Sequence, residues 1–168
     1  MSKKISRGFL ILTIFFSSTV SSESLFKDAT NRGINETCAL YLSQIEDSYD
    51  LQGLNITFAH PENPSLFPSL HISSQKYNNG TSTFSATLSP DKDYCYLSTM
   101  HITSVNNQSC DEISKIKVES DPNLNVEKYA EGAYSIITPS DSSYQIILTA
   151  FGDKGCTINE TRMMWPGR

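Results

Sequence analysis

Four cysteines are the residues whose number and placement most directly indicate chemistry in this chain. They are Cys38, Cys95, Cys110 and Cys156. An even set of cysteines in an exported chain indicates disulfide bonds. A zinc site would need paired ligands at CxxC or HxxxH spacing, and the sequence contains neither pair. We therefore expect two disulfides and no metal site.

The three histidines are the next candidates, because histidine is the side chain most often used as a general acid or base. His60, His71 and His101 lie far apart, on three different predicted strands. The sequence has no G-x-S-x-G, H-E-x-x-H, P-loop or dinucleotide-binding motif. We expect each histidine to be a half-buried strand residue, and we expect no catalytic residue and no cofactor.

Two groups of acidic residues resemble known sites only in part. Asp91 and Asp93 lie close together, but in a polar turn where charges are usually solvated. A stretch that starts at Asp121 begins like a calcium-binding loop, but its sixth residue is Val126 and its twelfth is Gly132, where such a loop has Gly and Glu. We expect no calcium site there.

The first 22 residues have the pattern of a secretory signal peptide. Basic residues precede an uncharged apolar run, Phe9 to Phe16, and small residues follow it. This run is shorter than the roughly 20 residues that a membrane span needs. We expect cleavage after Ser22, which leaves residues 23–168 as a single exported domain, periplasmic or extracellular, without a membrane anchor.

The charge of the chain restricts its partners. The formal net charge is −5, and loss of the basic leader makes the exported domain more acidic. An acidic domain without a basic cluster repels phosphate backbones and anionic lipid heads. Nucleic acid and membrane surfaces are therefore not expected partners, whereas another protein, including a basic one, is compatible with the charge. Asn-x-Ser/Thr sequons indicate surface positions at Asn35, Asn55, Asn79, Asn107 and Asn159.

A long strand and the helix after it position two of the cysteines. From Tyr94 to Val105, apolar residues alternate on both faces, which predicts a central strand covered on both sides. Ser109 and Glu112 form a capping-box pattern just before an apolar run. The sequence therefore predicts that a helix begins near Cys110.

The length of this strand decides how the cysteines pair. At the usual rise per residue it holds Cys95 and Cys110 at least roughly 33 Å apart, whereas a disulfide needs Cα atoms within about 7 Å. If the strand is the last of a four-stranded antiparallel meander, the helix that carries Cys38 begins at the same end of the sheet as Cys95. This arrangement predicts the disulfides Cys38–Cys95 and Cys110–Cys156.

The remaining elements follow from periodicity. Residues 23–33 are expected to form a loose arm, and residues 120–133 either a short helix or a loop. The predicted fold class is α+β: a mostly antiparallel sheet of about seven strands packed against two helices, without an internal repeat. The other predicted elements are a helix at 34–49, strands at 54–60, 69–77 and 81–88, and a final meander at 134–138, 144–151 and 156–165.

The hairpin near Gly80 has two possible registers. A two-residue turn at Asn79-Gly80 follows the usual dipeptide rule, but it puts the apolar residues of the two strands on opposite faces. A three-residue loop from Asn78, with Gly80 at positive φ, pairs Leu70 with Leu88 and puts them on one face. Because a slip of one residue reverses every side chain, we predict the three-residue loop.

Two functional classes are compatible with these features. The first is an exported, non-enzymatic binding protein of the inhibitor, immunity or surface-interaction type, which recognises another protein. The alternative is a small secreted hydrolase whose dispersed His and carboxylate residues meet only in the folded chain. For the binding protein, Leu66 and Phe67 are candidate partner contacts, because three prolines stiffen their loop and lower the entropy lost on binding.

The signal-peptide prediction can be tested directly. The exported protein should begin at Glu23 after cleavage, because the small residues before that position suit signal peptidase. N-terminal sequencing of the secreted or periplasmic protein provides the measurement. Recovery of a chain that still begins at Met1 would show that the targeting interpretation is wrong.

Overall fold

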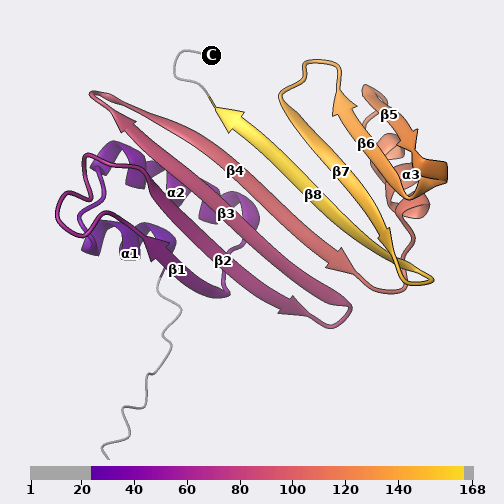
Figure 1. The fold of residues 1–168 in the computed structure, drawn as a ribbon, viewed down its shortest axis with the longest axis horizontal. Helices are drawn as coiled ribbons and strands as arrows, with labels where there is room; N and C mark the ends of the chain where they lie inside the picture. Colours follow the sequence, from indigo (N-terminus) through magenta and orange to yellow (C-terminus); the bar gives the residue numbers. More distant parts are fainter. Residues whose placement is uncertain (1–23, 165–168) are drawn as a thin grey trace, which may run out of the picture.

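The computed structural model describes residues 24–164, which form an α+β fold. One antiparallel sheet of eight strands has the order β1-β2-β3-β4-β8-β7-β6-β5 (Figure 1). The predicted signal peptide lies outside the described residues. The helices are α1 (Leu25–Asn31), α2 (Glu36–Tyr49) and α3 (Cys110–Ser120). The strands are β1 (Leu54–Phe58), β2 (Ser69–Tyr77), β3 (Gly80–Asp91), β4 (Tyr94–Val105), β5 (Leu124–Tyr129), β6 (Tyr134–Pro139), β7 (Tyr144–Phe151) and β8 (Gly155–Met164).

The fold consists of two halves with the same topology. In each half a helix is followed by a four-stranded meander: α2 with β1–β4, and α3 with β5–β8. The last strands of the two meanders, β4 and β8, pair antiparallel and join the halves into one sheet. The sequence shows no internal repeat, so the repetition lies in the order and pairing of the elements.

Both predicted disulfides are confirmed, and they occupy equivalent places in the two halves. Cys38–Cys95 joins the first turn of α2 to the start of β4, with the Cα atoms 5.2 Å apart. Cys110–Cys156 joins the first residue of α3 to the start of β8, with the Cα atoms 5.0 Å apart. Each disulfide therefore fixes a helix to the strand that its own half contributes to the central ladder.

The helix ends agree with local capping rules. The Asn35 side chain accepts a hydrogen bond from the N–H of Cys38 and caps α2. The predicted capping box of α3 is confirmed, since Ser109 and Glu112 each accept from the backbone N–H of the other. Asp50 caps the C-terminal end of α2 in the left-handed conformation typical of that position.

The prediction of a loose arm at residues 23–33 is wrong, because α1 forms there. Ser24 caps this helix, and Leu25 is fully buried. The backbone N–H groups of Leu25 and Phe26 donate to the carboxylate of Glu46 on α2. A short helix of this kind has too little periodicity to be recognised from sequence and is stabilised by its tertiary contacts.

All three helices pack on one face of the sheet, which we call the helix face. Two core clusters lie there, one beneath α1 and α2 and one beneath α3. Figure 1 looks onto the opposite face, which we call the open face, with the helices behind the sheet. The prediction that β4 is covered on both sides is therefore wrong for the described residues: Leu97 is 2% exposed on the helix face, whereas Tyr94 on the open face is 59% exposed.

The β2–β3 hairpin differs from its predicted register. Only Asn78 and Asn79 separate the paired residues Tyr77 and Gly80, and Leu88 pairs with Ser69 instead of Leu70. Gly80 is not at positive φ. The prediction failed because it considered only the apolar residues of β2 and β3.

Pairing of β2 with β1 explains why the apolar residues of β2 do not face those of β3. Leu70 and Ile72 face the open side, where they lie opposite Phe58 and Ile56 of β1. The apolar side chains thus meet across the β1–β2 ladder, in the cross-strand contacts that stabilise sheets. The helix face of β2 instead carries buried polar residues, which are Ser69, His71 and Ser73.

Residues 120–133 contain the strand β5 and a short turn of 3-10 helix. The prediction that this stretch forms either a short helix or a loop is therefore wrong. β5 pairs with β6 at the edge of the sheet. This strand raises the count from the expected seven to eight, and α1 raises the helix count from two to three. The predicted meander at the end of the chain is confirmed through Met164, and Trp165 lies outside the described residues.

The Gly80→Ala variant tests the observed hairpin. A Cβ at Gly80 would lie 2.0 Å from the carbonyl oxygen of Ser104 on β4, so the two strands would have to separate locally. We expect a loss of about 1–3 kcal/mol in the free energy of unfolding, measured by urea denaturation. NMR contacts that pair Leu70 with Leu88, or a variant as stable as the wild type, would contradict this register.

Candidate functional site

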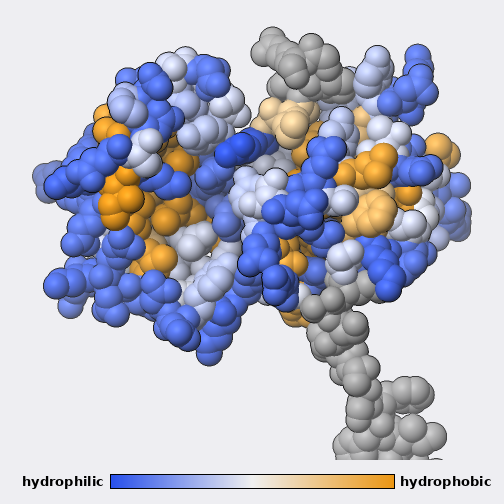
Figure 2. All heavy atoms as spheres, turned by 180° about the vertical axis from the view of Figure 1, so that it is seen from behind, coloured by the Kyte–Doolittle hydropathy of each residue, from blue (hydrophilic) through white to orange (hydrophobic). Residues whose placement is uncertain are grey.

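A groove on the helix face runs beside α2 above the ladder that joins the two halves. Its volume is about 430 Å³, within the usual range for ligand pockets. Figure 2 views this side and shows a depression between the α1–α2 part and the α3 part, with apolar surface on both parts. The groove is lined by residues of α2, β4 and β8, among them Tyr41, Ile45, Tyr49, Leu97, Arg162 and Met164.

The floor of the groove contains a cluster of polar side chains around Glu160. Arg162 donates from Nε and Nη2 to the same oxygen, Oε1 of Glu160, at 2.9 and 2.7 Å. The Tyr49 hydroxyl donates to that oxygen at 3.4 Å. The Arg162 guanidinium also lies over the ring of Tyr144, 4.7 Å from its centre, in cation–π geometry.

Burial and charge shift the pKa values of this cluster. Burial raises the pKa of the Tyr49 hydroxyl, and the Glu160 carboxylate raises it further. Burial alone would lower the pKa of Arg162, but its hydrogen bond and charge interaction with Glu160 raise it overall. Burial lowers the pKa of His101 against the opposing effect of Glu160. The ground state therefore contains an ion pair beside a neutral tyrosine and a largely neutral histidine.

Within the described residues, His101 is the histidine whose ladder partner carries a carboxylate. It lies opposite Glu160 in the β4–β8 ladder, and Ser82 Oγ lies 2.6 Å from its Nε2. A serine, a histidine and a carboxylate in this order could suggest a hydrolase. However, Ser82 is only 4% exposed, and the described hydrogen bonds of Glu160 go to Arg162 and Tyr49 instead of His101. The arrangement lacks an accessible nucleophile.

The contacts of the other two histidines give them roles in the fold. His71 is fully buried, and its two ring nitrogens lie 3.1 Å from Thr57 Oγ1 and 2.8 Å from Ser69 Oγ. His60 stacks against Phe67, with 4.5 Å between the ring centres. His60 Nδ1 also accepts from the backbone N–H groups that follow it, which organises the β1–β2 loop.

The two candidate partner contacts in this loop are exposed to solvent. Leu66 is 70% exposed and Phe67 is 45% exposed. Phe67 packs on His60, so part of the loop is ordered by its own aromatic contact. The role of Leu66 and Phe67 as partner contacts stays a prediction.

The acidic groups noted in the sequence remain separate from the groove. Asp91 and Asp93 are exposed at the β3–β4 turn. Asp121 accepts from the backbone N–H of Asn123 and ends α3. Within residues 24–164, no group of three or more His, Cys, Asp or Glu side chains is placed to hold a metal ion.

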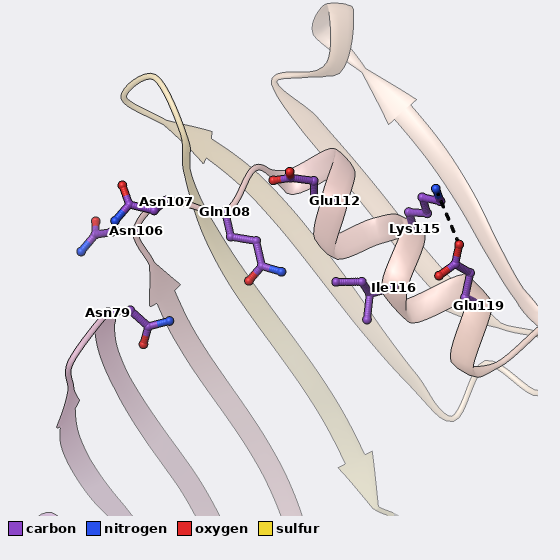
Figure 3. A pocket seen from close by; sticks show the side chains of 8 residues that line it. All are labelled: Asn79, Asn106, Asn107, Gln108, Glu112, Lys115, Ile116 and Glu119. Carbon is purple, nitrogen blue, oxygen red and sulfur yellow. Dashed lines mark ion pairs between the residues drawn. The ribbon is translucent and has the colours of Figure 1, made fainter.

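A second, shallower depression of about 580 Å³ lies between α3 and the adjacent loops. Figure 3 shows the side chains that line it, among them Gln108, Ile116 and the Lys115–Glu119 ion pair of α3. Asn79 and Asn107, two of the sequon residues, line its outer rim. Its polar, exposed lining contains no buried charge.

The open face is the largest surface on the described part of the chain without a covering layer. Register places alternate residues of every strand there. The only charged side chains among them are Lys76 and Asp91, near strand ends, and Glu127 on the edge strand β5. Its exposed aliphatic, Met and Phe side chains are Leu54, Ile56, Phe58, Met100, Phe151 and Met163.

Sequence reasoning missed the polar cluster of the groove. Glu160 and Arg162 occupy alternate positions of a predicted strand, so they had to share one face. Two opposite charges at that spacing, within an otherwise uncharged strand, were the available signal. Their meeting with Tyr49 could not be foreseen, because it depends on which strand of the sheet lies beneath α2.

The pH dependence of stability tests the buried state of His71. Burial lowers its pKa from 6.5 to about 4. Since the folded-state pKa is the lower one, the stability it contributes is complete above pH 6.5 and falls as the pH approaches 4. Between pH 7.5 and 4.5 the wild type should therefore lose about 2–3 kcal/mol more than His71→Gln, as measured by urea denaturation. Equal losses in the two proteins would contradict a neutral, buried His71.

Membrane spans, cellular compartment and similarity to known proteins complete the description of the chain. No helix within residues 24–164 is both long and apolar enough to cross a membrane. The two disulfides are consistent with an oxidising compartment. Comparison of the chain with protein-family models, with curated proteins and with solved structures finds no match in any of the three.

Proposed function

We propose that this chain is an exported, non-enzymatic binding protein that recognises another protein through the open face of its sheet. The observation that supports this most is the composition of that face. It contains apolar side chains, serines and threonines over eight strands, and its few charges lie at the margins. The solvent-facing side of an antiparallel sheet normally carries polar and charged residues. An apolar and almost uncharged side is instead typical of a protein interface.

The size of the open face suits a specific protein complex. With strands about 4.8 Å apart and residues about 3.3 Å apart, eight strands present on the order of 900 Å². A typical specific interface buries about 800 Å² on each partner. The apolar side chains concentrate on β1 and β2, at one edge of the sheet, where Ile56 and Phe58 are 41% and 56% exposed, and they would form the most apolar part of such an interface.

The composition of the open face also indicates what kind of surface the partner should present. An almost uncharged surface gives no electrostatic advantage to a strongly basic protein, even though the chain as a whole is acidic. The expected partner presents an uncharged surface with apolar and hydroxyl groups, such as the exposed face of another sheet. Nucleic acid remains an unsuitable partner, because a phosphate backbone requires basic groups that this face does not supply.

The β1–β2 loop extends the same region. Leu66 and Phe67 lie in the connection between Phe58 and Leu70, two residues that face each other on the open side. An exposed apolar pair on a proline-stiffened loop resembles the anchor of an interface. We therefore retain Leu66 and Phe67 as partner contacts beside the open face.

The alternative of a secreted hydrolase has weaker support. His101 and Glu160 do meet, but Ser82 is buried and the carboxylate is bound to Arg162. A hydrolase also needs hydrogen-bond donors for an oxyanion beside an accessible nucleophile. A fluorophosphonate probe that labels Ser82 of the folded protein would favour the hydrolase.

A charge introduced into the centre of the open face tests the proposal. Met100 is 38% exposed at this position, so Met100→Asp should leave folding intact. We expect it to abolish capture of the partner by immobilised protein from the extracellular fluid of the source cells, because a buried unpaired carboxylate is strongly unfavourable. Quantitative mass spectrometry of the captured proteins measures this.

The matched control is Leu40→Asp, which places the same charge on the exposed side of α2, where Leu40 is 52% exposed. The control should capture the same proteins as the wild type. Unfolding curves should show that both variants remain folded. If Met100→Asp captures the same partners in the same amounts as Leu40→Asp, the open face is not the interface.

A further inference from the structure

We propose that the helix-face groove binds a carboxylate group attached to an apolar body, with Arg162 as the residue that holds the carboxylate. This site lies on the opposite side of the sheet from the open face, so it does not depend on the proposed protein interface. The chemistry is shared by a free apolar monocarboxylate and by the C-terminal residue of a peptide.

The hydrogen bonds of Arg162 leave one edge of its guanidinium available. Nε and Nη2 both donate to Oε1 of Glu160, which uses the side edge of the group. Among the described residues, Nη1 has no hydrogen-bond partner. A guanidinium has five N–H donors in a fixed plane, so the end edge formed by Nη1 and Nη2 can still bind a carboxylate through two parallel hydrogen bonds.

The more exposed charge in this groove is the positive one. The side chain of Arg162 is 44% exposed, whereas that of Glu160 is 16% exposed. Glu160 therefore neutralises the guanidinium only from below, and no other charged residue lines the groove. In a chain with a net charge of −5, an accessible arginine in a concave site gives an anion a local attraction that the overall charge of the chain opposes.

The guanidinium is also held in place before a ligand arrives. Glu160 binds it on one edge, and the Tyr144 ring lies against its plane at 4.7 Å. A side chain fixed in this way loses little further entropy on binding. Preorganised bidentate recognition of carboxylates is the task for which arginine is better suited than lysine.

The walls of the groove define the rest of the ligand. Ile45, Leu97 and Met164 line it together with the ring of Tyr41. These side chains can bury an aliphatic or aromatic group next to the arginine. A volume of about 430 Å³ accommodates a ligand of the size of a fatty acid fragment or an amino-acid residue rather than a large cofactor.

Calorimetry with two matched pairs of probes tests this site. The pairs are 4-phenylbutyrate with 4-phenylbutyramide, and N-acetyl-Leu-Phe with its C-terminal amide. At least one carboxylate should bind with a Kd below about 1 mM, and its amide should bind at least tenfold more weakly. Binding of the free acid alone indicates a small-molecule ligand, and binding of the peptide acid indicates a peptide C-terminus.

Three variants assign the binding to Arg162. Arg162→Gln should abolish binding of the carboxylate. Met164→Glu, at a position that is 52% exposed, should weaken it at least tenfold by repulsion without disturbing the ion pair. Arg32→Gln is the matched control, because Arg32 also pairs with a carboxylate, Asp28, but on α1, and it should bind as the wild type does.

Several results would overturn the proposal. These are equal binding of acid and amide, no binding of either acid by the wild type, or full binding by folded Arg162→Gln. Unfolding curves establish that each variant is folded. If Arg162→Gln fails to fold, Met164→Glu decides, and unchanged affinity in that variant would also overturn the site.

Discussion

The ladder between β4 and β8 is the interaction on which the rest of this structure depends. It pairs Leu97 with Met164 at one end and Val105 with Cys156 at the other. Without it the chain would be two small helix-and-meander units, each with a single core cluster. Such units are marginal because they bury little of their surface. The ladder converts two exposed edge strands into the centre of one sheet.

The ladder also relates the two halves by an approximate two-fold axis. If Cys95 is superposed on Cys156, the position equivalent to Met100 is Thr161, and these two residues pair with each other. The axis therefore passes between them. An antiparallel pair related in this way has its axis perpendicular to the sheet, which puts the helices of both halves on the same face. The uncovered open face follows directly from this geometry.

The sequence allowed most of the framework to be predicted. The alternation from Tyr94 to Val105 and the capping box at Ser109 were sufficient to exclude Cys95–Cys110, because strand length is a fixed physical quantity. The assumption of a four-stranded antiparallel meander then selected Cys38–Cys95 and Cys110–Cys156 from the two remaining pairings. α1 could not be predicted, since seven residues with two buried side chains carry almost no periodic signal. Its stability comes from Leu25 and from contacts with Glu46, which lies on a different helix.

The surfaces that we propose to be functional were harder to predict for a different reason. An apolar residue such as Met100 gives the same pattern whether a helix covers it or nothing does, so the sequence could not identify the open face. The register of β2 had a similar ambiguity, because Leu70 and Ile72 match the apolar residues of both β1 and β3. In each case the missing information was which element lies on the other side of the strand.

The approximate symmetry also separates what the fold needs from what it does not. The residues equivalent to Glu160 and Arg162 in the other half are Thr99 and His101, which occupy the same helix face of the sheet. The fold therefore forms at those positions with uncharged side chains. Partial burial of an ion pair costs several kcal/mol in lost hydration, which its mutual attraction offsets only with good geometry. A pair placed in the floor of a groove, where the equivalent positions show that the fold does not require it, is better explained by recognition than by stability.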